Sequence, residues 1–531
     1  MKRNALCLAV GLALSSLGGT ALAGTCGDSG FNPYTCTADT GYDDIFLTGA
    51  SAPDNFLETT ITSWLATGYV KITDGTSNYR AFVGRLKNAD PVPEAHRGKS
   101  IRLIKRSAGG SAFGVGPVAR DEFLTVLDVK NSAGTCTGST SRTCPTVGTD
   151  GVSGMKPTFG VSDVSPTMFK GPLNLEYIAA LGGTVTPLTS AEQSGMTITP
   201  ANSLMMGIVA TNAVPATTVL TRAVYGDLLR KGGYADWSQV DPALTASGSL
   251  ATKPGVVVCR RYPGSGTQSS YNWYFGGFPC SLGSVNGNAY AEPKELADSA
   301  GYDPDGDGQP GNAGETGASS ATAYTLDVTA GVTVIENSGS GDVRNCLEMA
   351  NTGGVYKFKN REGKWFKADF GTGGYGAIGV LSLDSLNNQN KCGYTSGVPN
   401  TSPCAASTGY NEKTVFGWSF RTLDGAGTYT DSNDGTSTSP VLSSGATGIA
   451  PSKANLISGA YDFAAELTFQ YKTSKVTGTT KAFVDSLVAA IAAPAGNTSV
   501  WVAAIPPADS GDNTAKASRE GNMCSPLKFF Y

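Results

Sequence analysis

The chain has 531 residues, of which 40% are hydrophobic, 15% are charged and only one is histidine. This length and composition predict a globular protein with a sizeable core and more than one domain. Its 39 lysines and arginines against 43 acidic residues make it mildly acidic, which argues against nucleic acid as a partner. With a single histidine, zinc and redox metal sites are also disfavoured.

The first 23 residues have the order of a cleaved secretory signal. Lys2 and Arg3 precede an apolar run, and the small-residue segment Ala21-Leu22-Ala23 follows it. The run is too short to span a membrane, and no later segment has the roughly 20 uninterrupted apolar residues of a transmembrane helix. We therefore expect a soluble exported protein that starts near Gly24, in the periplasm or at the outer surface of a bacterium.

Cysteine usage fits an exported chain. Of the 11 cysteines, Cys7 lies in the signal, and the even number that remains favours disulfides. Close spacing predicts three that close short polar loops: Cys26–Cys36, Cys136–Cys144 and Cys392–Cys404. The sequence leaves open how the other four pair, which are Cys259, Cys280, Cys346 and Cys524.

After an N-terminal tail at 24–42, strand and helix patterns alternate. Residues 45–48 predict a short strand, and the apolar positions after Asp54 predict a helix near 54–66 with Asp54 as its cap. Residues 101–104 predict another strand, with a small turn at 107–110 behind it. Strand, turn and helix in this order are typical of an α/β fold. Polar cysteine-bounded segments near 131–157 and 387–409 are expected to be loop insertions.

The lone His96 limits the enzyme classes. A Ser-His-Asp hydrolase would have to use this histidine, which lies in a loop rich in proline and basic residues. The chain also has no G-x-S-x-G segment of the kind that presents a nucleophilic serine. The sequence therefore argues against a hydrolase of that type.

Four places repeat one local design, a turn of glycine and hydroxyl residues directly ahead of a helix. The first turns of helices present unpaired N–H groups and the positive end of the helix dipole, and glycines let backbone approach a ligand closely. Several such turns at one point would bind a small anion, whereas each alone is more often a helix cap with a tight loop. The turns are 48–51, 107–111, 264–267 and 338–342.

These segments resemble the phosphate-binding protein of bacterial phosphate ABC transporters, in the type 2 periplasmic binding protein superfamily. The resemblance covers about 43–490 and is most specific in the loop from Arg261 to Thr267. MMGIVATNAVP at 205–215 resembles the crossover into the second domain, and GTGGYGAIGVLSLD at 371–384 resembles the return strand. The other motifs, in the family's order, are LTGASAP at 47–53, RSAGGS at 106–111, GVSDVSPTMF at 160–169 and VVVCRRYPGSGTQSSYNWYF at 256–275.

The resemblance implies a concrete phosphate site. Arg261 would supply a charged, bidentate contact. Asp163 would accept a hydrogen bond from protonated phosphate and repel the fully ionised sulfate. The residues that would donate hydrogen bonds to phosphate oxygens, through side chain or backbone, are Ser51, Ala52, Ser107, Gly109, Gly110, Ser265, Gly266 and Thr267.

The chain departs from the family pattern at Pro263, which stands where relatives have a second aspartate in the arginine loop. Either Asp163 alone senses the proton of the ligand, or the ligand differs from ordinary phosphate. The first loop is also shorter than the usual form. Arg106 has no family counterpart, and we expect it to be a solvated flank of its turn.

The fold implied by the resemblance is two α/β lobes with the ligand cleft between them, plus disulfide-bearing loop insertions. We expect the first lobe to comprise 43–205 and 377–531, and the second 206–376. An insertion at about 276–335 would belong to the second lobe. Crossover strands would join the two lobes.

A second candidate site lies in that insertion. Asp303, Asp305 and Asp307, with Gly308 at the sixth position, copy the start of a calcium loop, in which carboxylate oxygens surround the cation. The twelfth position of such a loop is Gly314 here instead of an acidic residue. Calcium and a solvated acidic turn both stay open, and we favour the turn. No other cofactor is expected.

The function expected is capture of inorganic phosphate, or a related tetrahedral oxyanion, by a non-enzymatic exported solute-binding protein. The resemblance further implies delivery to an ABC permease. The alternative is a secreted or cell-surface structural or interaction protein that reuses the fold, because the long Gly/Ser/Thr insertions and many cysteines exceed what a transport receptor needs. A phosphatase is a weaker alternative, since the sequence shows no metal cluster or activated nucleophile.

Overall fold

The structure is a computed structural model that describes residues 24–530, apart from 281–315, 386–393, 396–397, 400–416, 431–440, 494–501, 506–513 and stretches of one to four residues. The signal segment 1–23, the acidic turn 303–307, and Cys392 and Cys404 lie outside the described residues. Within the described parts of the chain, no helix has the length and apolar character needed to cross a membrane.

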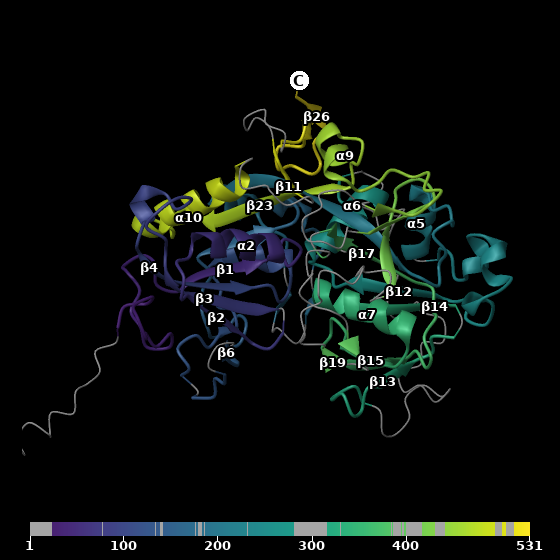
Figure 1. The fold of residues 1–531 in the computed structure, drawn as a ribbon, viewed down its shortest axis with the longest axis horizontal. Coiled ribbons are helices and arrows are strands. Elements are labelled where there is room, and N and C mark those ends of the chain that lie inside the picture. Colours follow the sequence, from purple (N-terminus) through teal and green to yellow (C-terminus); the bar gives the residue numbers. More distant parts are fainter. Residues whose placement is uncertain are drawn as a thin grey trace, which may run out of the picture.

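One mixed sheet runs through the molecule (Figure 1). Its inner strands are buried along their length, which is the pattern of a sheet covered on both faces. In spatial order the main path of the sheet consists of β14 (Val332–Asn337), β12 (Val256–Arg261), β17 (Ala377–Ser382), β11 (Met196–Thr211), β23 (Ala464–Lys472), β8 (Phe159–Ser162), β1 (Ile45–Gly49), β4 (Ser100–Arg106), β3 (Tyr79–Arg85), β2 (Val70–Thr73) and β6 (Arg142–Thr143). Four more strands branch from β11: β20 (Trp418–Arg421) with β21 (Thr428–Thr430) and β22 (Val441–Leu442) on one side, and β24 (Val502–Ala504).

Two parallel groups of strands define the two lobes. In the first lobe β1 pairs in parallel with β4 and β8, and in the second β12 pairs in parallel with β14 and β17. The long strand β11 joins them, because 196–205 pair with β23 and 206–210 pair with β17. Figure 1 shows β11 and β23 along the top, above a left-hand group with β1 and β4 and a right-hand group with β12 and α7.

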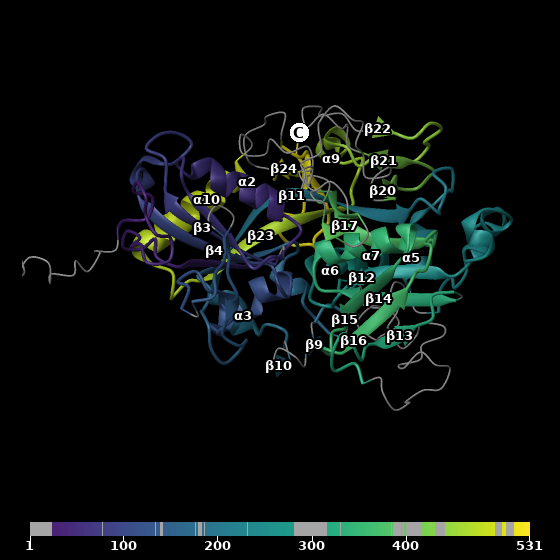
Figure 2. The same cartoon turned by 60° about the horizontal axis from the view of Figure 1, so that its bottom comes forward.

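Helices cover both lobes, and shorter strands extend them (Figure 2). The α-helices are α2 (Asp54–Trp64), α3 (Gly116–Arg120), α4 (Ser190–Ser194), α5 (Arg222–Leu229), α6 (Gly266–Gly276), α7 (Ser340–Thr352), α9 (Lys453–Ser458) and α10 (Gly478–Ala492). The 3-10 helices are η1 (Glu94–His96), η2 (Ser111–Gly114), η3 (Pro166–Met168), η5 (Trp237–Gln239), η6 (Pro242–Thr245) and η7 (Ser249–Ala251). The remaining strands are β5 (Val126–Leu127), β7 (Thr146–Val147), β9 (Tyr177–Ile178), β10 (Gly183–Thr184), β13 (Tyr324–Leu326), β15 (Val355–Lys359), β16 (Trp365–Asp369), β18 (Tyr394–Thr395), β19 (Val398–Pro399), β25 (Ala517–Ser518) and β26 (Lys528–Phe529).

The α/β fold class is confirmed, and the predicted strands and helices around the four turns are present as β1 with α2, β4 with its turn, β12 with α6, and α7. The helix prediction was wrong in one detail. Asp54 is the first residue of α2 and makes no capping bond, because Pro53 occupies the cap position and the Asp54 carboxylate faces other partners.

The lobe boundary at residue 377 does not coincide with a change of lobe in the sheet. β17 starts at Ala377 and pairs with β12 of the second lobe, with Val258 opposite Ile378. The chain reaches the first lobe again in β23, where Phe469 is paired with Val161 of β8. We therefore propose that the second lobe extends beyond 376, to the segment before β23.

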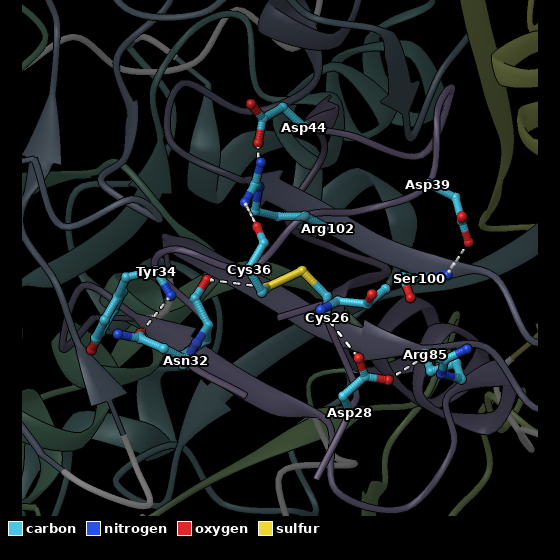
Figure 3. Close-up of a disulfide and its surroundings, with 12 residues drawn as sticks. Cys26, Asp28, Asn32, Tyr34, Cys36, Asp39, Asp44, Arg85, Ser100 and Arg102 are labelled. Atoms are coloured by element: carbon cyan, nitrogen blue, oxygen red, sulfur yellow. Dashed lines mark hydrogen bonds and ion pairs between the residues drawn. A yellow bond between two sulfur atoms is a disulfide. The ribbon is translucent and has the colours of Figure 1, made fainter. Parts of the chain in front are cut away.

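Two short-range disulfides are confirmed, Cys26–Cys36 and Cys136–Cys144. The first closes a loop within the N-terminal tail, which lies against the sheet (Figure 3). Asp28 pairs with Arg85 of β3 at 2.5 Å, and Arg102 of β4 donates to the Cys36 carbonyl at 3.4 Å. The tail is therefore held to the first lobe by ionic and hydrogen-bonded contacts.

The structure also pairs the four cysteines that the sequence left open. Cys259 of β12 is bonded to Cys346 of α7, 87 residues away, and Cys280 is bonded to Cys524, 244 residues away. A cross-link over a long segment removes more entropy from the unfolded chain than a short one. The Cys259–Cys346 bond also fixes the strand that ends at Arg261 against the helix that begins at Ser340.

His96 belongs to the core of the first lobe. It is 2% exposed, and its ring packs against Phe483 of α10. Its Nδ1 is hydrogen-bonded to the Tyr42 hydroxyl at 2.8 Å and its Nε2 to the Ser486 hydroxyl at 3.1 Å. Burial lowers the pKa of this histidine, so the neutral ring is favoured. This environment is that of a structural histidine.

Candidate anion-binding site

Four loops meet at the candidate site, each at the carboxyl end of a strand in one of the parallel groups. They follow β1, β4, β12 and β14 and lead into α2, η2, α6 and α7. In open α/β sheets ligands bind at such strand ends, where helix N-termini are exposed. The loops of the two lobes contact each other: the Ala112 N–H donates to the Gly264 carbonyl at 2.9 Å, and the Ser51 and Ser340 hydroxyl oxygens lie 3.3 Å apart.

Arg261 is the buried cation at this junction, with 2% of its surface exposed. Its Nη1 donates to the hydroxyl oxygens of Ser51 at 3.2 Å and Ser340 at 3.1 Å. Its Nη2 donates to the Ser338 carbonyl at 2.7 Å. A serine that accepts from the guanidinium still has a hydroxyl proton to donate, so the pair can hydrogen-bond an anion in front of the arginine.

Asp163 lies in the loop after β8 and is 1% exposed. Its backbone N–H donates to the Ser111 hydroxyl at 3.1 Å, and the Thr267 hydroxyl donates to its Oδ2 at 3.3 Å. Its Oδ1 is buried and has no hydrogen-bond partner in the described part of the chain. Such an oxygen is costly to bury unless a donor meets it.

The charge state of Asp163 follows from this environment. Burial raises the pKa of Asp163 to about 6, against the lowering effects of the Arg261 charge and the Thr267 hydroxyl. The carboxyl therefore changes its protonation in a range close to that in which phosphate exchanges its second proton. Above pH 6 the ionised carboxylate can accept a hydrogen bond from a protonated ligand.

Two glycines allow the loops of the site to approach one another. Gly110 has φ +70°, and a Cβ added to it would lie 3.2 Å from the Ser265 Cα and 3.4 Å from the Arg261 Nη2. A Cβ on Gly266 would lie 2.3 Å from the Ser111 hydroxyl and 2.6 Å from the Asp163 Cβ. Any side chain at either position would separate the arginine loop from the loops of the first lobe.

The remaining predicted residues are close to this junction but have structural partners. The Ser265 hydroxyl accepts a hydrogen bond from the Gln268 N–H at 3.4 Å as the cap of α6. The Ala52 carbonyl accepts from the Ser382 hydroxyl at 2.9 Å, so β17 contacts the first loop. Gly109 has φ +83°, a backbone conformation in which a residue with a side chain would be strained.

Ser107 faces a buried ion pair instead of Arg261. Its hydroxyl is 2.7 Å from the Asp54 Oδ2 and accepts from the Lys105 Nζ at 2.8 Å. Lys105 also donates to the Ala50 carbonyl at 2.9 Å and the Arg106 carbonyl at 3.0 Å. It thereby ties the loop after β1 to the loop after β4. Burial lowers the pKa of Lys105 to about 8, although Asp54 opposes that shift.

Sequence reasoning missed three residues of this arrangement: Lys105, Asp54 and Ser340. A lysine inside a strand whose neighbours are apolar was the available signal for Lys105. Asp54 was interpreted as a helix cap, and Ser340 was part of the fourth turn but was not assigned to the site. All three depend on contacts between segments far apart in the chain.

The expectation that Arg106 is a solvated flank was wrong. Its side chain is 1% exposed, and its guanidinium pairs with Asp150 through Nη1 at 2.5 Å and Nη2 at 2.7 Å. It also lies 4.9 Å above the Phe113 ring. Asp150 comes from the polar insertion that follows β7, so the insertion supplies the counter-charge that makes burial of Arg106 tolerable.

The predicted calcium residues Asp303, Asp305 and Asp307 lie outside the described residues, so that prediction stays a prediction. Among the residues that the structure does describe, no group of three His, Cys, Asp or Glu side chains is arranged to hold a metal ion.

Comparisons with known proteins give structural matches only. No protein-family model and no curated protein sequence matches the chain. Several solved structures that match are substrate-binding proteins of phosphate ABC transporters. One, from Clostridium perfringens, is assigned to that class and was solved with bound phosphate; it has 11% identity and a TM-score of 0.34, over 84% of this chain and 92% of that one.

Two further matches are similar in kind. PstS from Borrelia burgdorferi has 10% identity and a TM-score of 0.29, over 84% of this chain and 92% of that one. An ABC-type phosphate transport receptor from Vibrio cholerae has 13% identity and a TM-score of 0.25, over 62% of this chain and 73% of that one. At these TM-scores the likeness carries no argument about ligand or role, so the function of this chain has to be inferred from its own residues.

Proposed function

We propose that this chain is an exported, non-enzymatic solute-binding protein that captures inorganic phosphate, or a related tetrahedral oxyanion, between its two lobes. The observation that carries the proposal is that a buried arginine, Arg261, and a buried carboxyl, Asp163, both lie at the junction of the two lobes. Arg261 and two serine hydroxyls supply donors, and Asp163 supplies an acceptor oxygen that has no hydrogen-bond partner among the residues that the structure describes. A protonated phosphate has both the acceptors and the donor that this set requires.

The proposal assigns a ligand role to each member of the set. Arg261 would neutralise the anion through charge-assisted hydrogen bonds. The Ser51 and Ser340 hydroxyls and the first N–H groups of α6 and α7 would donate to the other oxygens. Asp163 would accept the ligand's own proton, which makes a fully ionised anion unfavourable at the same place.

Export and delivery to an ABC permease are part of the same proposal. Export is supported by the charged, apolar and small-residue order of the first 23 residues. Delivery to a permease rests on the motif resemblance. Cell fractionation with an antibody against the protein would show whether it is in the periplasm or outside the cell. A deletion strain that takes up phosphate as fast as the parent strain would contradict delivery to a permease.

The direct test is equilibrium dialysis of the purified mature protein against radiolabelled phosphate. We expect saturable binding of one phosphate per chain at micromolar concentration. Competition with unlabelled phosphate should displace the label, and competition with sulfate at pH 8 should not. Absence of retained label up to millimolar phosphate, from protein with a cooperative melting transition, would disprove the proposal.

The raised pKa of Asp163 predicts how stability depends on pH. Because its folded pKa of about 6 lies above the ordinary 3.8, its contribution to stability is present below pH 3.8 and is lost as the pH rises through about 6. Asp163→Asn is neutral at every pH, so at pH 8 the ligand-free variant should be more stable than the wild type by about 3 kcal/mol, or two pKa units. At pH 4 the two should be equal.

Urea unfolding of both proteins at pH 4 and pH 8 measures this difference. The same variant should lose the preference for phosphate over sulfate in dialysis at pH 8, because an amide no longer repels sulfate. A variant that is less stable than the wild type at both pH values, or that keeps the full preference, would rule out the role assigned to Asp163.

A further inference from the structure

A cavity of about 520 Å³ opens beside the candidate anion site. Ser51 and Ser340, whose hydroxyls contact Arg261, form its inner end. From there it extends between the outer face of α2, the hairpin of β2 and β3, and the first turn of α7. It lies within the 300–1,000 Å³ that is typical of pockets for small organic ligands, and it is far larger than one phosphate ion needs.

The cavity is present although the lobes already touch on either side of it. At its inner end the hydroxyl oxygens of Ser51 and Ser340, one from each lobe, lie 3.3 Å apart. At the outer side Gly339 of the second lobe lies so close to Asn78 of the hairpin that an added Cβ would be 3.3 Å from the Asn78 Oδ1. The space is therefore bounded by contacts between the lobes instead of being the gap of two separated lobes.

The walls of the cavity are polar, and their charges are mostly paired with one another. Glu58 pairs with Lys71 and with Arg80, whose Nη1 is 2.8 Å from the Glu58 Oε2. Arg80 also lies 3.2 Å from Asp54. With Arg344 of α7 added, three cations and two carboxylates line the space, which leaves a positive balance suited to an anionic ligand.

The uncharged lining consists mainly of hydroxyl and amide groups. Thr59, Thr62, Thr73, Thr76 and Asn55 line the space. The hydroxyls of Thr59, Thr62 and Thr76 already donate to the Asn55 carbonyl, the Glu58 carbonyl and the Asp74 carboxylate, so they can offer a ligand acceptor oxygens. Among the described residues that line the cavity, Tyr69 is the single aromatic side chain, so no second ring is placed to stack a nucleobase from the other side. Acceptor oxygens beside the donors of Lys71, Arg80 and Arg344 favour a ligand that carries hydroxyl groups.

We propose that the ligand of this site is a phosphomonoester with a hydroxyl-bearing organic part, such as a sugar phosphate. This inference rests on the proposed function, because it uses the same anion site for the phosphate group. The phosphate would lie at Ser51, Ser340 and Arg261 as the monoanion, because the fully ionised ester would be repelled by Asp163 as sulfate is. The organic part would lie along the threonines of α2 and the hairpin. Binding requires no bond to be made or broken.

Glucose 6-phosphate and inorganic phosphate are the two probes of the test, measured by isothermal titration calorimetry with the full mature chain at about pH 5, where the ester, whose second pKa is about 6, still carries one proton. Glucose 6-phosphate is expected to bind at least tenfold more tightly than phosphate. Thr59→Trp should abolish this tenfold advantage by filling the cavity, while phosphate binding stays within twofold of the wild type. Thr59 is exposed and its hydroxyl donates to the Asn55 carbonyl of its own helix, so the fold should tolerate the change.

Thr59→Ala is the matched control, because it removes the same hydroxyl without adding bulk; it should keep at least half of the advantage. If phosphate binds and glucose 6-phosphate binds no more tightly, the ester is excluded while the anion site stands. If neither probe binds, the anion site itself is refuted. If Thr59→Trp leaves the advantage intact, or removes phosphate binding as well in a protein that melts normally, the cavity is not where the organic part lies.

Discussion

Arg261→Met should weaken phosphate binding at least 100-fold, about 2.7 kcal/mol at 1.36 kcal/mol per tenfold change. Arg261 is the buried cation that contacts both Ser51 and Ser340, and hydrogen bonds to a charged donor are about twice as strong as neutral ones. Without it, the anion would enter a site that contains the carboxyl of Asp163 and has no facing guanidinium. Equilibrium dialysis with radiolabelled phosphate measures the loss.

Two further variants separate the role of Arg261 in binding from a role in folding. Arg261→Lys keeps the charge but not the planar fork, so its affinity should lie between those of wild type and Arg261→Met. Arg222→Met removes an arginine that is 41% exposed and pairs with Asp424 away from the junction, so it should bind as the wild type does. If Arg261→Met retains wild-type affinity, Arg261 does not contact the ligand and the proposed site is incorrect.

Lys105→Met should lower the free energy of unfolding by about 3–5 kcal/mol, the usual cost of breaking a buried ion pair. Lys105 is 2% exposed, and its ammonium joins Asp54, the Ser107 hydroxyl and the Ala50 carbonyl. Its removal would leave three buried acceptors short of a donor. Urea unfolding at pH 7, with the disulfides intact, measures the change.

Lys130→Met is the matched control, because Lys130 pairs with Asp44 on the surface with 57% of its side chain exposed. Exposed pairs contribute about 0–1 kcal/mol, so this variant should remain close to the wild type. The double variant Lys105→Met/Asp54→Asn should recover part of the loss, since no uncompensated charge stays buried. A loss below 1 kcal/mol for Lys105→Met would show that the ammonium is not what holds the two loops.

The sequence was sufficient to predict the features that depend on neighbouring residues. The four glycine-hydroxyl turns, the strands at 45–48 and 101–104, and the helices after the first, third and fourth turns are local patterns, since capping and φ > 0 are properties of a few consecutive residues. The disulfides Cys26–Cys36 and Cys136–Cys144 close short loops and were predictable for the same reason. The Arg261 loop was found because its motif is contiguous.

Features that join distant segments were not predictable in this way. The counter-charge of Arg106 is Asp150, 44 residues later, and the partner of Cys259 is 87 residues later. β17 could not be assigned to a lobe from its position in the chain, because strand order in a sheet is set by pairing and not by sequence order. Each of these required the packed molecule.

The sequence by itself determined the α/β fold class and the local design of the four glycine-hydroxyl turns. The tertiary structure alone decided which residues those turns bring together: Ser340 beside Ser51 at Arg261, and Lys105 beneath them with Asp54 and Ser107. The physical reason is that burial and charge pairing depend on distances in space. The partner of a lysine or arginine in a strand cannot be identified from the sequence, because it is set by how the sheet and its loops pack.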